Sequence, residues 1–293
     1  MWQLLQIELF KIFRKPRTYI SFGAIAAMVL IIQIALKFDG ASYVEFILGS
    51  LKDSLEIPYN SILNGYFVCF VILNLLLIHI PLLIALVAGD VVAGEANMGT
   101  LRLLVTKPVS RTQLMLAKFL ATVVYTALLL VWMAFLALLL SVAFFGVNDI
   151  IVARNDVLEI IKSNDVLWRY MAAFAYATVA LTTVAALAFL LSVFAENSIG
   201  PIVSTISIVI VFTILSEMQI PMYDRTVKPW LFTSHMLAWK GFFYTKTDEG
   251  HNGIPGSLEN FPAILRSCGI LIGYIFLFVT AAIMAFKKKD ILS

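Results

Sequence analysis

Six long runs of uncharged, apolar residues constrain this chain more than any other feature of its sequence. Each run is close to the roughly 20 residues that a helix needs to cross about 30 Å of hydrocarbon. Helices satisfy their own backbone hydrogen bonds in lipid, and runs of this length exclude a membrane β-barrel. We therefore predict an all-α integral membrane protein with a single domain over residues 1–293. Its spans are expected at about 18–36, 66–93, 114–146, 170–195, 199–216 and 267–286.

Composition agrees with this fold class, because 61% of the residues are hydrophobic and only 13% are charged. A soluble domain of 293 residues could not bury so much apolar surface. The first run follows basic residues, as a signal peptide does, but the Ala-x-Ala at 24–26 lies inside the apolar stretch. We interpret it as an uncleaved first span.

Residues 1–15 have the pattern of an amphipathic helix. Its apolar side would carry Trp2, Leu5, Leu9, Ile12 and Phe13, and its opposite, polar side Glu8, Lys11, Arg14 and Lys15. Pro16 then interrupts the helix, which predicts an elbow between a helix on the membrane surface and the first span. The alternative is that these residues only begin a longer first helix.

The distribution of basic residues predicts the orientation of the spans. One side of the predicted topology collects eleven Lys and Arg against five acidic residues, whereas the other side holds ten basic and thirteen acidic residues on longer segments. The positive-inside rule places the first side in the cytoplasm. Both termini, the loop at 94–113 and the short connection around residues 196–198 are then cytoplasmic. Residues 37–65, 147–169 and 217–263 become extracytoplasmic loops, the first two polar and the last long and aromatic.

Rings in the long loop predict a short helix or re-entrant piece at the outer membrane interface, where such rings prefer to sit. They are Trp230, Phe232, Trp239, Phe242, Phe243 and Tyr244.

Motifs for catalysis or cofactor binding are absent from the sequence. It has no Gly-x-x-x-x-Gly-Lys-Ser/Thr phosphate loop and no His-Glu-x-x-His, and its three histidines are scattered. Cys69 and Cys268 both fall in predicted spans, where they are expected to be ordinary buried thiols. A formal charge of +3 gives no support for a nucleic-acid partner. We expect a protein that is not an enzyme and carries no cofactor or metal.

Polar residues inside the spans are candidates for a substrate pathway or for helix packing, because they are costly in lipid. Asn74 and His79 share the second span with Pro81, and His79 could be hydrogen-bonded structurally or face a pathway. Asp90 lies at the cytoplasmic end, where a solvated or loop-pairing role is favoured over proton relay. In the fourth span, Thr178 and Thr182 belong to a row of small residues, which predicts close packing against a helix of this chain or of a second copy.

The cytoplasmic loop at 94–113 has the most local structure. Gly99 and Thr100 resemble a turn and an N-cap, and the stretch from Leu101 could form a short cross-helix that Pro108 ends. A capping box from Ser110 to Gln113 opens the third span. Such an element could dock a partner protein, or could simply contact anionic lipid.

This loop resembles that of the ABC type-2 membrane permeases, in particular the branch with bacitracin-export and nitrous-oxide-reductase-maturation permeases. The matching positions are Gly94, Glu95, Gly99, Thr100, Leu101, Arg102, Leu103, Leu104, Pro108, Val109, Ser110, Arg111, Ala117 and Lys118. The likeness extends to Leu191–Phe194 and to Glu196, Asn197 and Ser198 in the second cytoplasmic connection, and to the elbow helix with six spans. The sharp motif covers only about 25 residues, and the long outer loop departs from the pattern.

The resemblance implies a permease subunit that couples ATP hydrolysis, by two copies of a separate cytoplasmic ATPase, to export. A second permease subunit, here expected to be another copy of this chain, would complete the complex in a prokaryotic plasma membrane. The loop would act as a coupling helix, with Glu95 and Arg102 as polar contacts and Leu103 and Leu104 as buried ones. Two alternatives stay open, namely a related complex that transmits force or signal without exporting a solute, and a secondary carrier or membrane enzyme. The substrate cannot be deduced from the spans.

Overall fold

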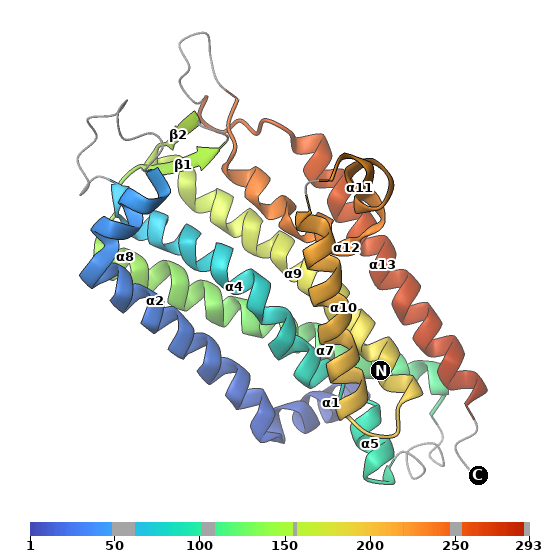
Figure 1. The fold of residues 1–293 in the computed structure, drawn as a ribbon. Coiled ribbons are helices and arrows are strands. Elements are labelled where there is room, and N and C mark those ends of the chain that lie inside the picture. The colour runs from blue at the N-terminus through green and yellow to red at the C-terminus, as the bar shows by residue number, and fades with distance from the viewer. Residues whose placement is uncertain (49–61, 101–108, 155–156, 219, 247–253, 290–293) are drawn as a thin grey trace.

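The computed structural model describes residues 1–48, 62–100, 109–154, 157–218, 220–246 and 254–289 (Figure 1). Within these ranges, six helices are long and apolar enough to cross a membrane, as predicted. They are built on α2 (Pro16–Leu48), α4 (Gly65–Ala88), α7 (Arg111–Ala134), α9 (Ser163–Phe194), α10 (Ile199–Glu217) and α13 (Phe261–Lys288). Figure 1 shows both chain termini at one end of the bundle and a β-hairpin at the other. We call these the termini end and the hairpin end.

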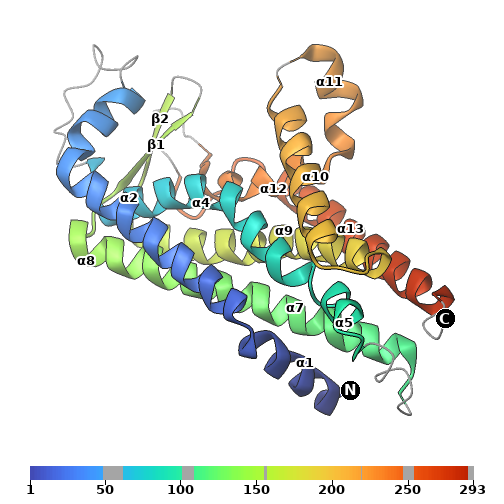
Figure 2. The same ribbon diagram turned by 60° about the horizontal axis from the view of Figure 1, so that its bottom comes forward.

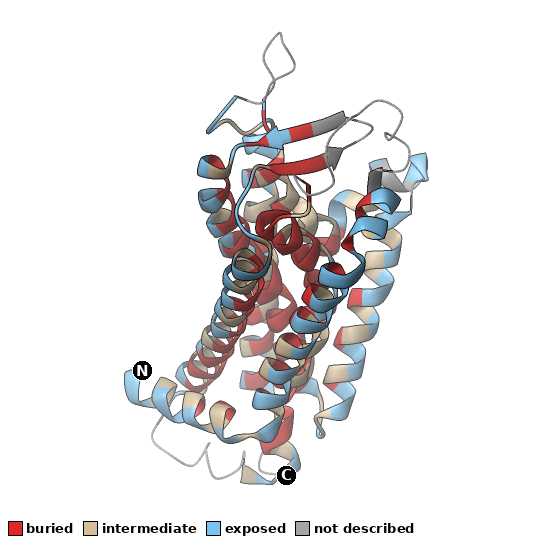
Figure 3. Ribbon diagram, turned by 90° about the vertical axis from the view of Figure 1, so that its left-hand side faces the viewer, coloured by how far each residue is buried: buried red, intermediate tan, exposed pale blue. Residues whose placement is uncertain are grey.

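The N-terminal elbow is confirmed. Helix α1 (Trp2–Arg14) ends at Lys15, whose backbone is extended, and α2 begins at Pro16. Proline suits a first helical position because the missing N–H would have no partner there. Figure 3 shows α1 lying across the termini end rather than along the spans, so the alternative of one longer first helix is wrong.

The predicted polar side of α1 is wrong at Glu8, which is only 4% exposed. Trp2, on the predicted apolar side, is 68% exposed. Helix α1 lies beside α7 (Figure 2), and the side of α1 that carries Glu8 turns toward a buried lysine of α7. Glu8 is therefore buried because it forms an ion pair, although a polar side chain on a surface helix would be expected to face water.

Helix α9 is the centre of the bundle and contacts α4, α7, α10 and α13. Its small residues, among them Ala173, Ala177 and Ala185, are buried and let these helices approach closely. Figure 3 shows the buried residues gathered along the middle of the bundle. The close packing predicted for the fourth span is thus made with helices of this chain.

Helix α7 continues through a π-helical turn, η2 (Phe135–Leu140), into α8 (Ser141–Phe145). Gln33 of α2 donates to the carbonyl oxygen of Leu136 and to the hydroxyl of Ser141, at 3.2 and 2.9 Å. The amide nitrogen of this polar side chain thus finds two acceptors in the apolar part of the bundle, while its Oε1 has no hydrogen-bond partner among the described residues.

Two strands form the hairpin end, β1 (Ile150–Arg154) and β2 (Val157–Ile161), paired antiparallel with Ile150 opposite Ile161. We expected residues 147–169 to be a polar loop, and this expectation is wrong. Residues 150–152 are β-branched and buried, which favours a strand, and α9 already begins at Ser163.

The long segment at 217–263 folds into short helices, as its aromatic residues indicated. They are α11 (Pro221–Thr226), η3 (Lys228–Trp230), α12 (Phe232–Met236) and η4 (Leu237–Phe243). Phe232, Trp239 and Phe243 are buried against other rings of the bundle, while Trp230 is 75% exposed. Three of the six rings therefore lie in the protein interior.

Candidate functional site

A cluster of charged and hydroxyl side chains connects the spans at the termini end. We call it the hub, and it consists of Glu8, Lys11, Lys15, Arg17, Asp90, Glu95, Lys118, Ser192 and Ser198. Asp90 and Glu95 flank the turn between α4 and the short helix α5 (Ala93–Asn97). The hub therefore surrounds the beginning of the segment in which the sequence motif lies.

Lys118 lies at the centre of the first half of the hub and is fully buried. Its Nζ lies 2.9 Å from Oε2 of Glu8 and 2.6 Å from Oε2 of Glu95, and it donates to the carbonyl oxygen of Val91. The contact with Glu95 is an ion pair whose angle is too bent for a hydrogen bond. Burying a lone lysine would cost several kcal/mol, so these partners make its position possible.

Lys11 completes this half of the hub from the other side of the two carboxylates. Its Nζ lies 2.7 Å from Oε1 of both Glu8 and Glu95. Two lysines and two glutamates therefore alternate around one site, and they join α1, α5 and α7.

Asp90 organises the second half of the hub and is 2% exposed. Its carboxylate pairs with Lys15 at 2.5 Å and with Arg17 at 2.8 Å, both at the start of the first span. It also accepts a short hydrogen bond from the hydroxyl of Ser198, just before α10. Of the roles considered for Asp90, the pairing role is the one that the geometry supports.

Ser192, near the end of α9, holds the turn before α5. Its hydroxyl oxygen accepts from the backbone N–H groups of Val92 and Ala93, at 3.0 and 2.9 Å. The first N–H groups of a helix have no partner within it, so this side chain satisfies two donors that would otherwise be buried alone.

Two positions of the motif require glycine, each for a different structural reason. A Cβ on Gly94 would lie 2.4 Å from Oδ1 of Asp90, so only glycine leaves room for that carboxylate. Gly99 has φ +68°, a backbone conformation that favours glycine, which confirms the predicted turn. Thr100 follows it and donates to the carbonyl oxygen of Glu95.

Electrostatics within the hub favour the charged forms of its α1 side chains. Burial alone would raise the pKa of Glu8, but Lys118 and Lys11 hold that pKa below its usual value of 4.5. Burial would lower the pKa of Lys11, but Glu8 and Glu95 raise it above its usual 10.5. Both groups therefore stay ionised at neutral pH.

Other predicted residues at this end make separate contacts. Arg111 donates to the carbonyl oxygens of Phe286, Lys287 and Lys289, which ties the start of α7 to the end of α13. Ser110 accepts from the N–H of Gln113, as its predicted capping role requires. Asn197 caps α10 through the N–H of Gly200, and Glu196 is exposed. Leu101, Arg102, Leu103, Leu104 and Pro108 lie outside the described residues.

The candidate pathway residues do not come together. His79 is exposed on α4 with its Nδ1 2.6 Å from the carbonyl oxygen of Leu75, and Asn74 donates to that of Phe70. Thr178 and Thr182 bond to carbonyl oxygens one turn earlier in α9. All four side chains are thus satisfied by their own helices.

Sequence reasoning missed several members of the hub. Glu8 and Lys11 are predicted on the polar side of a surface helix, and the motif includes Lys118 without predicting that it is buried. One signal was present, because Lys118 lies seven residues after Arg111, well inside the third predicted helix. A basic residue at that depth indicates a buried acidic partner.

The side chains of the hub offer charge pairing and hydrogen bonding. Across the described ranges, no group of three or more His, Cys, Asp and Glu side chains could hold a metal ion. The arrangement can transmit a displacement of one element to its neighbours, because breaking any of the buried pairs would leave a charge without compensation.

The family and the relative that this chain matches have no established function. The sequence profile of a family described as "Protein of unknown function (DUF2705)" matches residues 23–292. The Bacillus subtilis (strain 168) protein "Uncharacterized protein YhcI" is 26% identical over 210 residues, which make up 70% of this chain. The match spans 63% of that relative's own length.

Proposed function

We propose that this chain, which belongs to the DUF2705 family of proteins of unknown function, is the membrane subunit of an ABC-type exporter. In this proposal a separate cytoplasmic ATPase, present in two copies, docks on the segment after the second span. Two copies of the chain form the pathway in a prokaryotic plasma membrane, and the termini end faces the cytoplasm. The motif at 94–111, which resembles the coupling loop of ABC type-2 permeases, first suggests this partner.

The proposal rests mainly on the polar contacts that the hub makes to the beginning of this docking segment, residues 90–95. Between Asp90 and Glu95, the chain has polar contacts to α1, α2, α7, α9 and the start of α10. Arg111, where the segment ends, adds α13. A partner that displaces the segment would therefore act on every span at once, as an ATP-driven exporter requires.

Docking would begin where the segment leaves the hub. Asn97, Met98 and Gly99 are exposed, and Met98 has 59% of its surface accessible. Methionine is enriched at protein interfaces, so Met98 would be one of the contacts to the partner. Leu103 and Leu104, which follow in the sequence, would supply further apolar contacts.

Co-expression with the proposed cytoplasmic ATPase would test docking. Replacing Met98, Leu103 and Leu104 together with Asp should abolish co-purification of the ATPase. Replacing Lys287 and Lys288 with Gln at the same end is the matched control and should leave co-purification unchanged. Retention of the ATPase by the triple variant would overturn the assigned docking segment.

A substitution in the hub separates docking of the ATPase from transmission of its movement to the spans. Lys118→Met should still bind the ATPase, since Lys118 is buried, but should lose most cargo-stimulated ATP hydrolysis in reconstituted vesicles. Hydrolysis that proceeds without any solute leaving the cytoplasmic side would contradict export and favour force transmission to a partner protein.

A further inference from the structure

The elbow between α1 and α2 carries more positive than negative charge. The paired and neighbouring charged side chains there are the cations Lys11, Arg14, Lys15, Arg17 and Lys118 and the carboxylates Glu8, Asp90 and Glu95. Five cations against three carboxylates leave a surplus of two positive charges. Lys11 and Lys118 balance Glu8 and Glu95, so the surplus belongs to the side chains of residues 14–17.

Asp90 holds two of these cations in place but cannot neutralise both. Its Oδ2 lies 2.5 Å from Nζ of Lys15, and its Oδ1 lies 2.8 Å from Nη1 of Arg17. Within the described ranges neither cation has a second acidic partner, and 30% and 34% of the two side chains are accessible. Their remaining N–H groups can therefore donate to an anion from outside, and Asp90 has already ordered them.

The position of the elbow places these cations at the surface of the membrane. Lys15 and Arg17 are the chain neighbours of Pro16, the first residue of the first span. Figure 3 shows α1 lying across the end of the bundle, so the chain turns into the bilayer at this point. Tyr19 and Ile20, in the next turn, are each 61% exposed, as side chains that face lipid would be. The two cations thus lie at the depth of the lipid headgroups.

The outer side of α1 also suits contact with lipid. Opposite Glu8, this helix exposes Trp2, Ile7 and Phe10, each to more than half of its surface. The guanidinium carbon of Arg14 lies 5.8 Å from the centroid of the Phe10 ring, so a cation borders this apolar side. Aromatic and apolar side chains beside a cation are typical of a helix at the membrane interface.

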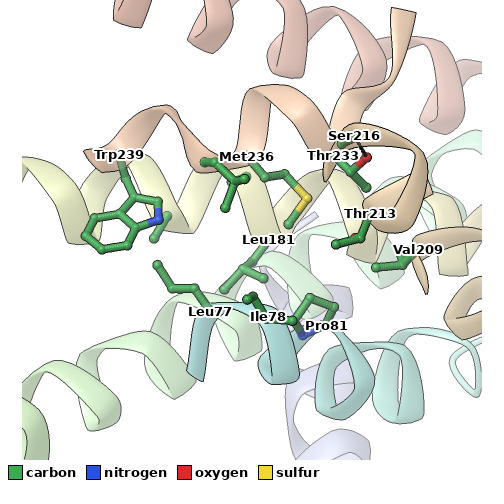
Figure 4. Close-up of a pocket in the computed structure, with 13 residues that line it drawn as sticks. Leu77, Ile78, Pro81, Leu181, Val209, Thr213, Ser216, Thr233, Met236 and Trp239 are labelled. Carbon is green, nitrogen blue, oxygen red and sulfur yellow. Dashed lines mark hydrogen bonds between the residues drawn. The ribbon is translucent and has the colours of Figure 1, made fainter. Parts of the chain in front are cut away.

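A lipid at the elbow would lie on the outside of the bundle. The hollow lined by Lys15, Arg17 and Asp90 has about 20 Å³ of free space, and the apolar one beside Trp239, between α4, α9 and α10 (Figure 4), has about 40 Å³. Since one water molecule takes up about 10–15 Å³, neither hollow admits a phosphate or an acyl chain. The ligand would therefore contact the accessible parts of the two cations, with its acyl chains beside α2.

We propose that the elbow binds the phosphodiester group of one anionic phospholipid of the phosphatidylglycerol class. The planar guanidinium of Arg17 donates to two phosphate oxygens, and the ammonium group of Lys15 adds a point charge. Arg14 strengthens the attraction. A zwitterionic headgroup carries a cation of its own and would leave the surplus charge of the elbow uncompensated. This inference goes beyond the proposed function and does not depend on it, because lipid binding needs neither ATP nor a partner chain.

Native mass spectrometry of the purified full chain, released from detergent micelles, tests the proposal. The probes are phosphatidylglycerol and a phosphatidylcholine with the same acyl chains. We expect the first phosphatidylglycerol to bind about fivefold or more tightly than the first phosphatidylcholine. Equal affinities for the two lipids would overturn the proposal.

Three variants locate the binding. Arg17→Gln removes the surplus charge beside Asp90 but leaves that carboxylate paired with Lys15, and should weaken phosphatidylglycerol binding about fivefold without affecting phosphatidylcholine. Arg17→Lys keeps the charge but not the planar fork, and should bind with intermediate affinity. Lys288→Gln removes an exposed positive charge at the same end and is the matched control, which should bind as wild type. Equal weakening by Arg17→Gln and Lys288→Gln would show diffuse attraction and no site at the elbow.

Melting temperatures show whether each variant is folded. Arg14→Gln lies outside the ion pairs of the hub and provides a second variant, which should weaken phosphatidylglycerol binding about two- to fivefold.

Two further results would assign the cations to another ligand and overturn the proposal. One is displacement of phosphatidylglycerol by an excess of inorganic phosphate but not by chloride of the same ionic strength, which would indicate a soluble phosphate compound. The other is unchanged phosphatidylglycerol binding by a folded Arg17→Gln protein that no longer co-purifies with the ATPase, which would indicate a protein partner.

Discussion

Lys118 shows how much a single buried charge can require of its surroundings. Its ammonium group is enclosed by Glu8, Glu95 and the carbonyl oxygen of Val91, contributed by three different elements. Replacing it with Met would leave two carboxylates in a buried site with only Lys11 as their partner. We expect Lys118→Met to lower the free energy of unfolding by about 3–5 kcal/mol, measured as a lower melting temperature in detergent.

A matched control distinguishes this effect from the general loss of a lysine. Lys288→Met removes an exposed lysine at the same end of the molecule and should change stability by less than about 0.5 kcal/mol. Adding Glu8→Gln to Lys118→Met should recover part of the loss, because one unpaired charge disappears. Equal melting temperatures for Lys118→Met and Lys288→Met would show that the buried pairs do not hold this end together.

Acid should weaken the hub through Glu8. Because the folded-state pKa of Glu8 lies below its usual 4.5, its contribution to stability is complete above about pH 4.5 and is lost as the pH falls through the lower, folded-state pKa. We expect the melting temperature of the wild type to fall more steeply below pH 4.5 than that of Glu8→Gln. Parallel curves for the two proteins would mean that Glu8 is not ion-paired in solution.

At the scale of elements, the turn between α4 and α5 depends on Gly94, because glycine has no side chain. Gly94→Ala would bring a methyl group to 2.4 Å from Oδ1 of Asp90, a carboxylate already held by Lys15 and Arg17. We expect this variant to lose about 1–3 kcal/mol of stability. Hydrogen exchange should be faster at the backbone amides of residues 92–96, which checks that the loss is local.

Gly269 in α13 is the matched control, because an added Cβ there meets nothing within 4 Å. Gly269→Ala should be neutral or more stable by about 0.5–1 kcal/mol, as expected for a helical glycine. A Gly94→Ala protein as stable as the Gly269→Ala protein would show that Asp90 can move aside at little cost.

The spans and the elbow could be predicted from the sequence because they follow from local properties. Hydropathy and length define the six helices, and Pro16 marks the break after α1. The position of Glu8 could not be predicted in this way, since periodicity identifies a polar side of a helix but not what covers it. The β-hairpin was missed because its two strands have only five residues each and lie between two long helical signals.

The hub could be predicted only in part. The resemblance singled out Glu95, Lys118 and Ser198, which do lie there, but the pairing of Asp90 with Arg17 joins residues that are far apart in the chain. A match between a particular lysine and a particular carboxylate depends on helix packing, which one sequence does not define. The same limit explains why Trp239 is predicted as an interfacial ring although it is buried in the bundle.

At the scale of the whole molecule, the polar contacts between spans concentrate at the two ends. The hub joins the spans at the termini end, and Arg169 at the hairpin end bonds to Asp165 and to the carbonyl oxygens of Phe242 and Ser257. Between these ends the helices meet mainly through apolar and small residues. Such contacts let helices slide or tilt more easily than ion pairs do, so movement driven from one end could reach the other.

This interpretation requires the termini end to face the cytoplasm, which accessible cysteines can test. Asn97 is exposed beside the hub, and Asn148 is exposed beside the β-hairpin. Each would be changed to Cys in a Cys268→Ser background, in which the remaining Cys69 is fully buried. The background protein itself is the control and should not react with a membrane-impermeant maleimide.

In intact cells we expect labelling of Asn148→Cys and none of Asn97→Cys until the membrane is permeabilised. The physical reason is the excess of basic residues at the termini end, which the positive-inside rule retains in the cytoplasm. The reverse pattern would place the hub on the side without ATP, and the proposed docking of an ATPase would then be impossible. Labelling of both positions in intact cells, together with labelling of a cytoplasmic marker enzyme, would instead show that the reagent had crossed the membrane.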